Sequence, residues 1–150
     1  MTRKQRTSVN TSTLPHYYRG ADVPMSVIRR FARQVAERFH PEKIILFGSY
    51  AYGRPHADSD VDILVIMPAR NQHDQAAKIR WAVPRPFAID LIVRTPKNLD
   101  WRLANGDMFH TEIVTKGRVL YEAGDARMVG QSRRRLLGRG RTSRKSKPAS

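Results

Sequence analysis

The chain has 150 residues, a length that fits one domain with one modest hydrophobic core. It contains no cysteine, which excludes a disulfide framework and a thiolate metal site, and no apolar run approaches membrane-spanning length. The basic N-terminal residues lead into polar residues rather than into the apolar core of a signal peptide. We therefore expect a cytoplasmic protein with no membrane partner.

The net charge of +15 lies mostly at the two ends of the chain. Residues 1–20 carry four basic residues and residues 131–150 carry eight, with no acid in either segment. Such composition is typical of solvated, disordered tails, which either have no specific role or make loose, non-specific contacts with nucleic acid. We expect a domain between two disordered basic segments, with the three parts spanning 1–21, 22–124 and 125–150.

The first predicted element is an amphipathic helix, because apolar residues recur at three- and four-residue spacing over residues 27–39. Asp22 is its expected N-cap, with Pro24 in the first turn, and Pro41 ends it. Short apolar runs bounded by breakers predict strands over 43–47, 61–67, 87–93 and 118–121. Further helices are predicted over 50–52, 71–81, 96–103 and 107–116. This order indicates an α/β (α+β) domain with one sheet covered by helices.

Three aspartates stand out at the predicted strands. Asp60 and Asp62 open the second strand, where side chains two residues apart point to the same face. Asp90 interrupts the third strand between apolar neighbours, so we expect it to be buried. An unpaired buried carboxylate is costly unless a cation or several donors compensate it. An exposed loop end with a capping role is the plainer alternative, and it fits Asp62 and Asp90 poorly.

A divalent ion shared by these aspartates supplies the compensation. Oxygen ligands without cysteine, and with His56 as the only nearby histidine, favour Mg²⁺ or Mn²⁺ over Zn²⁺. Magnesium held by few carboxylates keeps positions open for substrate phosphates, and two such ions about 4 Å apart can assist both the attacking and the leaving oxygen. Gly48 and Ser49, at a turn into a short helix, offer N–H groups and a hydroxyl to phosphate.

The motif formed by Gly-Ser at 48–49, Gly53 and Ser-Asp-Val-Asp at 59–62 resembles that of a known family. It is similar to the nucleotidyltransferase domain of the DNA polymerase β superfamily, and in particular to the stand-alone minimal nucleotidyltransferases that include antitoxins. The resemblance covers roughly residues 25–122. It implies a small mixed β-sheet with helices packed on one side, as in the palm of polymerase β, and transfer of NMP, with AMP from ATP as the expected case.

Roles follow from this resemblance by position. It implies that Asp60 and Asp62 bind two Mg²⁺ ions, and that Asp90 is a third carboxylate that helps to bind metal and to deprotonate the acceptor hydroxyl. It also implies that Gly48 and Ser49 hold the β- and γ-phosphates of the nucleoside triphosphate.

Two tyrosines depart from the family pattern. Many relatives carry arginine at the position of Tyr50 or Tyr52, and here Arg54 is the nearest replacement for contact with the nucleotide. We expect ordinary packing for at least one of these tyrosines. The other large residues are expected in the core or at an interface: Trp81 and Trp101 as core or interface anchors, and Met108, Phe109 and Ile113 as helix core.

The resemblance also implies a partner. Small members of the family commonly act with a separately encoded helical protein, and many form toxin–antitoxin pairs with an HEPN-type ribonuclease that is silenced by addition of AMP to a tyrosine. The alternative left open by the sequence is a catalytically weak or inactive module of the same fold, which neutralises a partner by contact or binds RNA through its basic tails.

Overall fold

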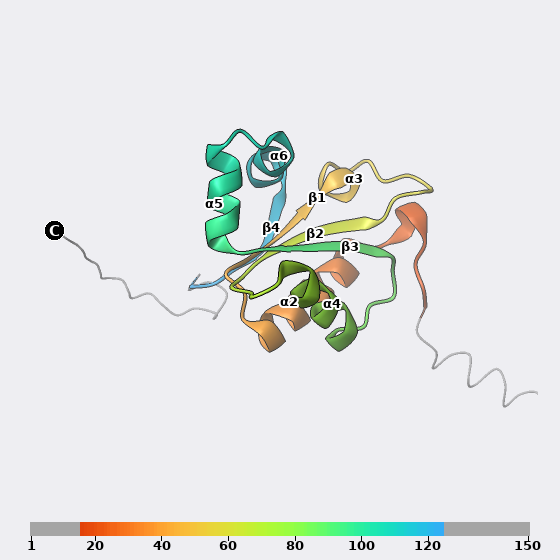
Figure 1. Ribbon diagram of the computed structural model, residues 1–150. Helices are drawn as coiled ribbons and strands as arrows, with labels where there is room; N and C mark the ends of the chain where they lie inside the picture. The colour runs from red at the N-terminus through yellow and green to blue at the C-terminus, as the bar shows by residue number, and fades with distance from the viewer. Residues whose placement is uncertain (1–15, 125–150) are drawn as a thin grey trace, which may run out of the picture.

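The computed structural model describes residues 16–124 (Figure 1). Its elements, in chain order, are η1 (Gly20–Asp22), α2 (Met25–Phe39), β1 (Lys43–Phe47), α3 (Gly48–Ala51), β2 (Val61–Ile66), α4 (Gln72–Ala82), β3 (Ile89–Arg94), α5 (Pro96–Ala104), α6 (Met108–Lys116) and β4 (Arg118–Glu122). Every strand and helix expected from the sequence is present, with ends that differ by a few residues. No helix within these residues is long and apolar enough to cross a membrane.

The four strands form one mixed sheet in the order β3-β2-β1-β4. β1 pairs antiparallel with β2 on one side and with β4 on the other, whereas β2 and β3 run parallel. A parallel pair needs a crossover connection, and α4 supplies it between β2 and β3. The predicted α+β class with a small mixed sheet is confirmed.

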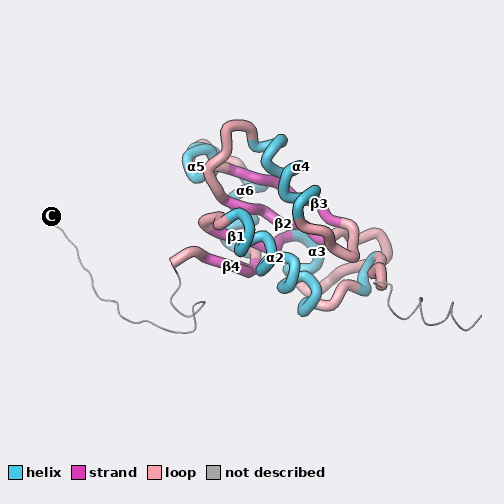
Figure 2. Tube along the Cα trace, turned by 90° about the horizontal axis from the view of Figure 1, so that it is seen from below, coloured by secondary structure: helices cyan, strands magenta, loops and turns pink. Residues whose placement is uncertain are grey.

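Helices cover both faces of this sheet, which corrects the expectation of helices on one side only. Figure 1 shows α2 and α4 below the sheet and α5 and α6 above it, and Figure 2 shows the α2–α4 side from below. The reason is that β1 and β2 are apolar on both faces, so each face needs a cover. Alternate residues of these strands enter a second core with α5 and α6, formed by Ile45, Phe47, Leu64, Ile66, Leu99 and Ile113.

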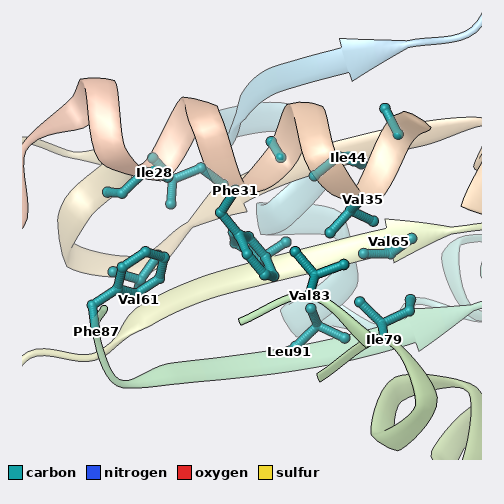
Figure 3. Close-up of a cluster of buried hydrophobic side chains, with 14 of the residues drawn as sticks. Ile28, Phe31, Val35, Ile44, Val61, Val65, Ile79, Val83, Phe87 and Leu91 are labelled. Carbon is teal, nitrogen blue, oxygen red and sulfur yellow. The ribbon is translucent and has the colours of Figure 1, made fainter. Parts of the chain in front are cut away.

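The larger core lies between the sheet and the pair α2 and α4 (Figure 3). Helix α2 contributes a buried stripe that includes Ile28, Phe31 and Val35, and α4 contributes Ile79. The ring of Phe31 packs edge-on against Phe87, with centroids 5.8 Å apart. This core packs against the face of the sheet opposite the one that Asp62 and Asp90 share with α6.

The start of α2 differs from the prediction. Pro24, in extended conformation, occupies the N-cap position, and Asp22 belongs to η1 instead. Because the helix begins only at Met25, Asp22 lies too early in the chain to cap its first turn. At the other end His40 adopts the left-handed conformation with φ 51°, and Pro41 follows, so the helix ends where the sequence indicated.

The described domain begins before residue 22. The backbone N–H of Tyr18 donates to the Pro86 carbonyl at 2.8 Å, and the Tyr50 hydroxyl donates to the Gly20 carbonyl. Residues 16–21, expected to belong to a disordered segment over 1–21, are therefore held against the domain. The rest of that segment, and the expected tail over 125–150, lie outside the described residues.

Candidate active site

Strand register brings two of the three predicted aspartates together. Asp62 is the second residue of β2, and in the parallel pairing with β3 it lies opposite Asp90. On its other side Asp62 lies opposite Phe47, the last residue of β1. Residues that pair across a sheet point to the same face, so the two carboxylates project side by side on the face that carries α6.

These carboxylates line a cleft of about 360 Å³ between the sheet, α3 and α6. A cleft of this size suits a small-molecule ligand. Acidic and aromatic side chains predominate in its wall, and within residues 16–124 no lysine or arginine lines it. Its lining residues are Phe47, Gly48, Tyr52, Asp62, Asp90, Phe109, Glu112 and Ile113.

Gly48 is required by the position of the Asp62 carboxylate. It has φ 73°, in the left-handed region, and a Cβ added there would lie 2.1 Å from Oδ2 of Asp62. No other residue can occupy this position without moving the carboxylate, since real Cβ atoms do not approach an oxygen so closely. Gly48, directly after β1, thus leaves the space that the Asp62 carboxylate occupies.

The electrostatics of the cleft are unfavourable in the absence of a cation. Partial burial raises the pKa of Asp62 to about 6, and the negative charges of Asp90 and Asp60 act in the same direction. Asp60 therefore acts on Asp62 through space, although it is exposed and does not line the cleft. The structure therefore brings Asp62 and Asp90 together in the cleft, with Asp60 near enough to influence the charge of Asp62.

Asp90 is exposed rather than buried, which corrects the sequence-based expectation. β3 is an edge strand of the sheet and Asp90 is only its second residue, because the strand begins at Ile89 rather than at Phe87. One side of this residue therefore faces solvent, where an ionised carboxylate costs little.

Ser49 and Arg54 contribute to the loop around the site. The Ser49 hydroxyl donates to Oγ of buried Ser59 at 2.9 Å, and Ser59 Oγ also accepts from the His56 backbone N–H at 2.7 Å. The Arg54 backbone N–H donates to the Ser49 carbonyl, while its side chain is exposed and does not line the cleft. These bonds tie the loop between α3 and β2 to the Gly-Ser turn, and phosphate contacts by Ser49 and Arg54 stay predictions.

The two tyrosines have different roles. Tyr50 is buried and its hydroxyl also accepts from the Val23 backbone N–H at 3.1 Å, so it packs the N-terminal segment onto the domain, as expected for one of the pair. Tyr52 lines the cleft, and its hydroxyl donates to Oε2 of Glu112 at 3.2 Å. Partial burial and the Glu112 carboxylate raise the pKa of Tyr52, which keeps the phenol protonated.

Helix α6 brings two residues to the site that the sequence reasoning missed, Phe109 and Glu112. Phe109 is 54 % exposed and Met108 is 80 % exposed, so the expectation that both belong to the helix core is wrong, whereas Ile113 is buried as expected. The helix turns His110 and Ile113 toward the sheet, which leaves the two residues before His110 outside. The three-residue spacing of Phe109 and Glu112 puts them on one helix face and was the available signal.

Comparison with known proteins agrees with this geometry. Residues 28–114 match the model of a protein family described as a nucleotidyltransferase domain. The chain belongs to this family. Nucleotidyltransferases are enzymes that transfer NMP from a nucleoside triphosphate with a divalent metal ion, and the prediction of an enzyme of this class is confirmed.

The nucleotidyltransferase is also similar to individual proteins. A "Putative protein adenylyltransferase" of Methanocaldococcus jannaschii is 29 % identical over 100 residues, which cover 63 % of this chain and 94 % of that protein. Among solved structures, a "putative nucleotidyltransferase from Sulfolobus solfataricus" superimposes with a TM-score of 0.48 and 20 % identity, covering 67 % of this chain and 81 % of that one.

The residues of the nucleotidyltransferase fit a hard divalent cation in their chemistry. Asp62 and Asp90 present carboxylate oxygens to one cleft, their mutual repulsion favours a bound cation, and no protein cation lines the cleft within the described residues. No three acidic or histidine side chains within residues 16–124 lie close enough to form a complete metal centre. Binding by Asp60 together with the other two therefore stays a prediction.

Proposed function

We propose that this nucleotidyltransferase transfers AMP from ATP to a tyrosine hydroxyl of a separately encoded helical protein of the HEPN type, as the antitoxin of a toxin–antitoxin pair. The observation that carries AMP transfer is the Asp62–Asp90 pair, opposite one another on paired strands beside Gly48. The choice of a protein acceptor is supported by the name of the relative from Methanocaldococcus jannaschii.

The chain's own residues divide the work of this reaction. Asp60, Asp62 and Asp90 would hold two Mg²⁺ ions, which when bound neutralise the carboxylates and the triphosphate charge. Gly48 and Ser49 orient the β- and γ-phosphates, with Arg54 as the nearest side-chain cation. Asp90, solvent-exposed at the cleft rim, takes the proton of the acceptor hydroxyl. The acceptor oxygen bonds to the α-phosphorus, the bond from that phosphorus to the bridging oxygen breaks, and pyrophosphate leaves.

The surface beside the cleft suits a protein acceptor. The adjoining helices α5 and α6 expose three large apolar side chains, Trp101 at 63 %, Met108 at 80 % and Phe109 at 54 %. Exposed apolar groups of this size mark sites of protein association. Because Phe109 also lines the cleft, a partner docked on these helices would have its tyrosine within reach of the carboxylates.

The test is transfer of label from α-labelled ATP in the presence of Mg²⁺, with and without the protein that the neighbouring gene encodes. Label on one tyrosine of that protein, abolished by Asp62→Asn and retained in Asp58→Asn, is the expected result. Asp58 is the matched control because it is an exposed aspartate in the loop before β2 and does not line the cleft. Transfer that persists in Asp62→Asn would overturn the assignment of the site.

One observation favours the second candidate, a module that neutralises its partner by contact alone. Tyr50 and Tyr52 replace the arginine of many relatives, and no arginine or lysine lines the described cleft. Neutralisation of the partner by Asp62→Asn without ATP would support this candidate. Failure of that variant to neutralise the partner would support the transferase.

A further inference from the structure

A second recessed surface lies on the face of the sheet opposite the active site. Two adjoining hollows of about 400 and 450 Å³ open between α2, α4 and the turn that follows α4. They share Pro84 and Arg85, so together they form one continuous surface, which we call the α2–α4 groove. Figure 1 shows α2 and α4 together on this face, on the other side of the sheet from α5 and α6.

The α2–α4 groove is cationic. Arg30 and Arg85 line the first hollow, Arg80 and Arg85 line the second, and no aspartate or glutamate lines either of them within the described residues. None of these three arginines takes part in the salt bridges of residues 16–124. The positive charge of the groove is therefore not neutralised by the described part of the chain.

Two hydrogen bonds hold the Arg85 side chain in place, and one of its N–H donors has no partner within the described residues. Its Nη1 donates to the backbone carbonyls of Arg80 at 3.0 Å and Val83 at 3.3 Å, which fixes the guanidinium at the junction of the two hollows. Its Nε is buried and has no hydrogen-bond partner within residues 16–124. A buried, unpaired donor on a cation costs free energy, and an anionic acceptor entering the groove would remove that cost.

Aromatic side chains stand beside these cations. Trp81, in the last turn of α4, is 87 % exposed, and Tyr17 is 47 % exposed with the Arg19 guanidinium 5.0 Å from its ring centroid. An exposed indole beside fixed cations offers a stacking face to a base. The expectation of Trp81 as a core anchor is excluded by this exposure.

We propose that the α2–α4 groove binds single-stranded nucleic acid, with phosphates on Arg30, Arg80 and Arg85 and bases stacked on Trp81 and Tyr17. Interleaved cations and exposed aromatic rings are what a single strand needs, because each nucleotide offers one anion and one stacking face. A peptide carries a negative charge only where it has an acidic residue, whereas a nucleic-acid strand supplies one at every nucleotide for Arg30, Arg80 and Arg85. This inference does not depend on the proposed transfer of AMP.

The two tryptophans of the chain make the test specific. In full-length Trp101→Phe the only indole is Trp81, and in full-length Trp81→Phe the only indole is Trp101. Titration with ten-residue oligouridylate and, separately, oligothymidylate should quench the fluorescence of Trp101→Phe and leave that of Trp81→Phe unchanged. The tighter-binding oligonucleotide identifies the strand as RNA or DNA.

Affinity gives an independent readout by fluorescence anisotropy. Trp81→Ala and Arg80→Gln, both at exposed positions, should each weaken binding about fivefold or more, the effect of removing one stacked base or one phosphate interaction. Trp101→Ala and Arg118→Gln, exposed on other elements, are the matched controls and should bind like the unaltered protein. Three results would overturn the proposal. They are equal quenching in both single-tryptophan proteins, an equal loss of affinity in all four variants, and no binding of either oligonucleotide.

Discussion

Gly48 links backbone conformation to the position of the Asp62 carboxylate. Gly48→Ala should lower nucleotide transfer about 100-fold, because its Cβ would displace Oδ2 of Asp62, and a misplacement of about 1 Å has an effect of this order. Gly53→Ala is the matched control: Gly53 also has positive φ, 74°, but no atom lies within 4 Å of the added Cβ. Steady-state transfer from labelled ATP measures both variants, and an equal decrease in both would show that backbone strain, not the clash, matters.

Asp62 is expected to destabilise the free protein at neutral pH. Its folded pKa of about 6 lies above the value of 3.8 for an unperturbed aspartate, so the folded state resists ionisation of this group. The resulting loss of folding free energy is absent below about pH 4, grows as the pH rises from about 4 to about 6, and is complete above about pH 6. Asp62→Asn should therefore unfold about 4 °C higher than the unaltered protein at pH 7.5 without divalent ions, after allowance for solvent screening.

The same pair of proteins tests metal binding. Addition of Mg²⁺ at pH 7.5 should raise the melting temperature of the unaltered protein, because a cation removes the repulsion among Asp60, Asp62 and Asp90, and should leave Asp62→Asn nearly unchanged. At a fixed Mg²⁺ concentration this rise in melting temperature should shrink as the pH drops below about 6, because protons then compete with the metal ion for Asp62. An equal response of both proteins to Mg²⁺ would exclude Asp62 as a ligand.

At the scale of elements, the fold was largely predictable because its strands are short apolar runs between strong breakers. The apolar runs predicted β1 and β2 with nearly correct ends, Pro41 follows the end of α2 as expected, and α6 ends at Lys116, the predicted residue. The sequence did not show that both faces of the sheet are covered, since a run that is apolar throughout does not say how many helices pack on it.

Only the part of the site formed by residues close together in the sequence was predictable. Asp62 and Gly48 lie within one short stretch, so their partnership could be inferred from spacing. Glu112 and Phe109 come from a helix much later in the chain, and their place in the cleft depends on how α6 packs on β1. The exposure of Asp90 depends on β3 being at the edge of the sheet, which no local pattern reveals.

Two buried isoleucines allow the roles of the two faces to be separated. Ile113 of α6 and Ile79 of α4 are both almost fully buried, on opposite faces of the sheet. Replacement of either by alanine should lower the free energy of unfolding by about 2–5 kcal/mol through the cavity it leaves. Only Ile113→Ala should also lower transfer at temperatures where both variants are folded, because α6 forms a wall of the cleft. Equal activity of the two folded variants would contradict this role of α6.

At the scale of the whole molecule, charge is separated across the sheet. The active-site cleft on one face is lined by acids, and the α2–α4 groove on the other is lined by arginines. A polyanion is therefore repelled from the unmetallated cleft and attracted to the opposite face. This separation lets substrate chemistry and nucleic-acid binding occur on one small domain without competition for the same residues.

The basic C-terminal segment should add to this attraction without providing its specificity. Removal of residues 131–150 takes away eight cations, and for each phosphate that these cations neutralise the slope of log affinity against log salt should become shallower by about 0.7. The truncated protein should still bind oligouridylate more weakly after Trp81→Ala, because stacking on the groove does not depend on those cations. Anisotropy titrations at several salt concentrations measure both effects. An unchanged slope would exclude the segment from binding. If Trp81→Ala no longer weakened binding after truncation, stacking on Trp81 would depend on the C-terminal segment.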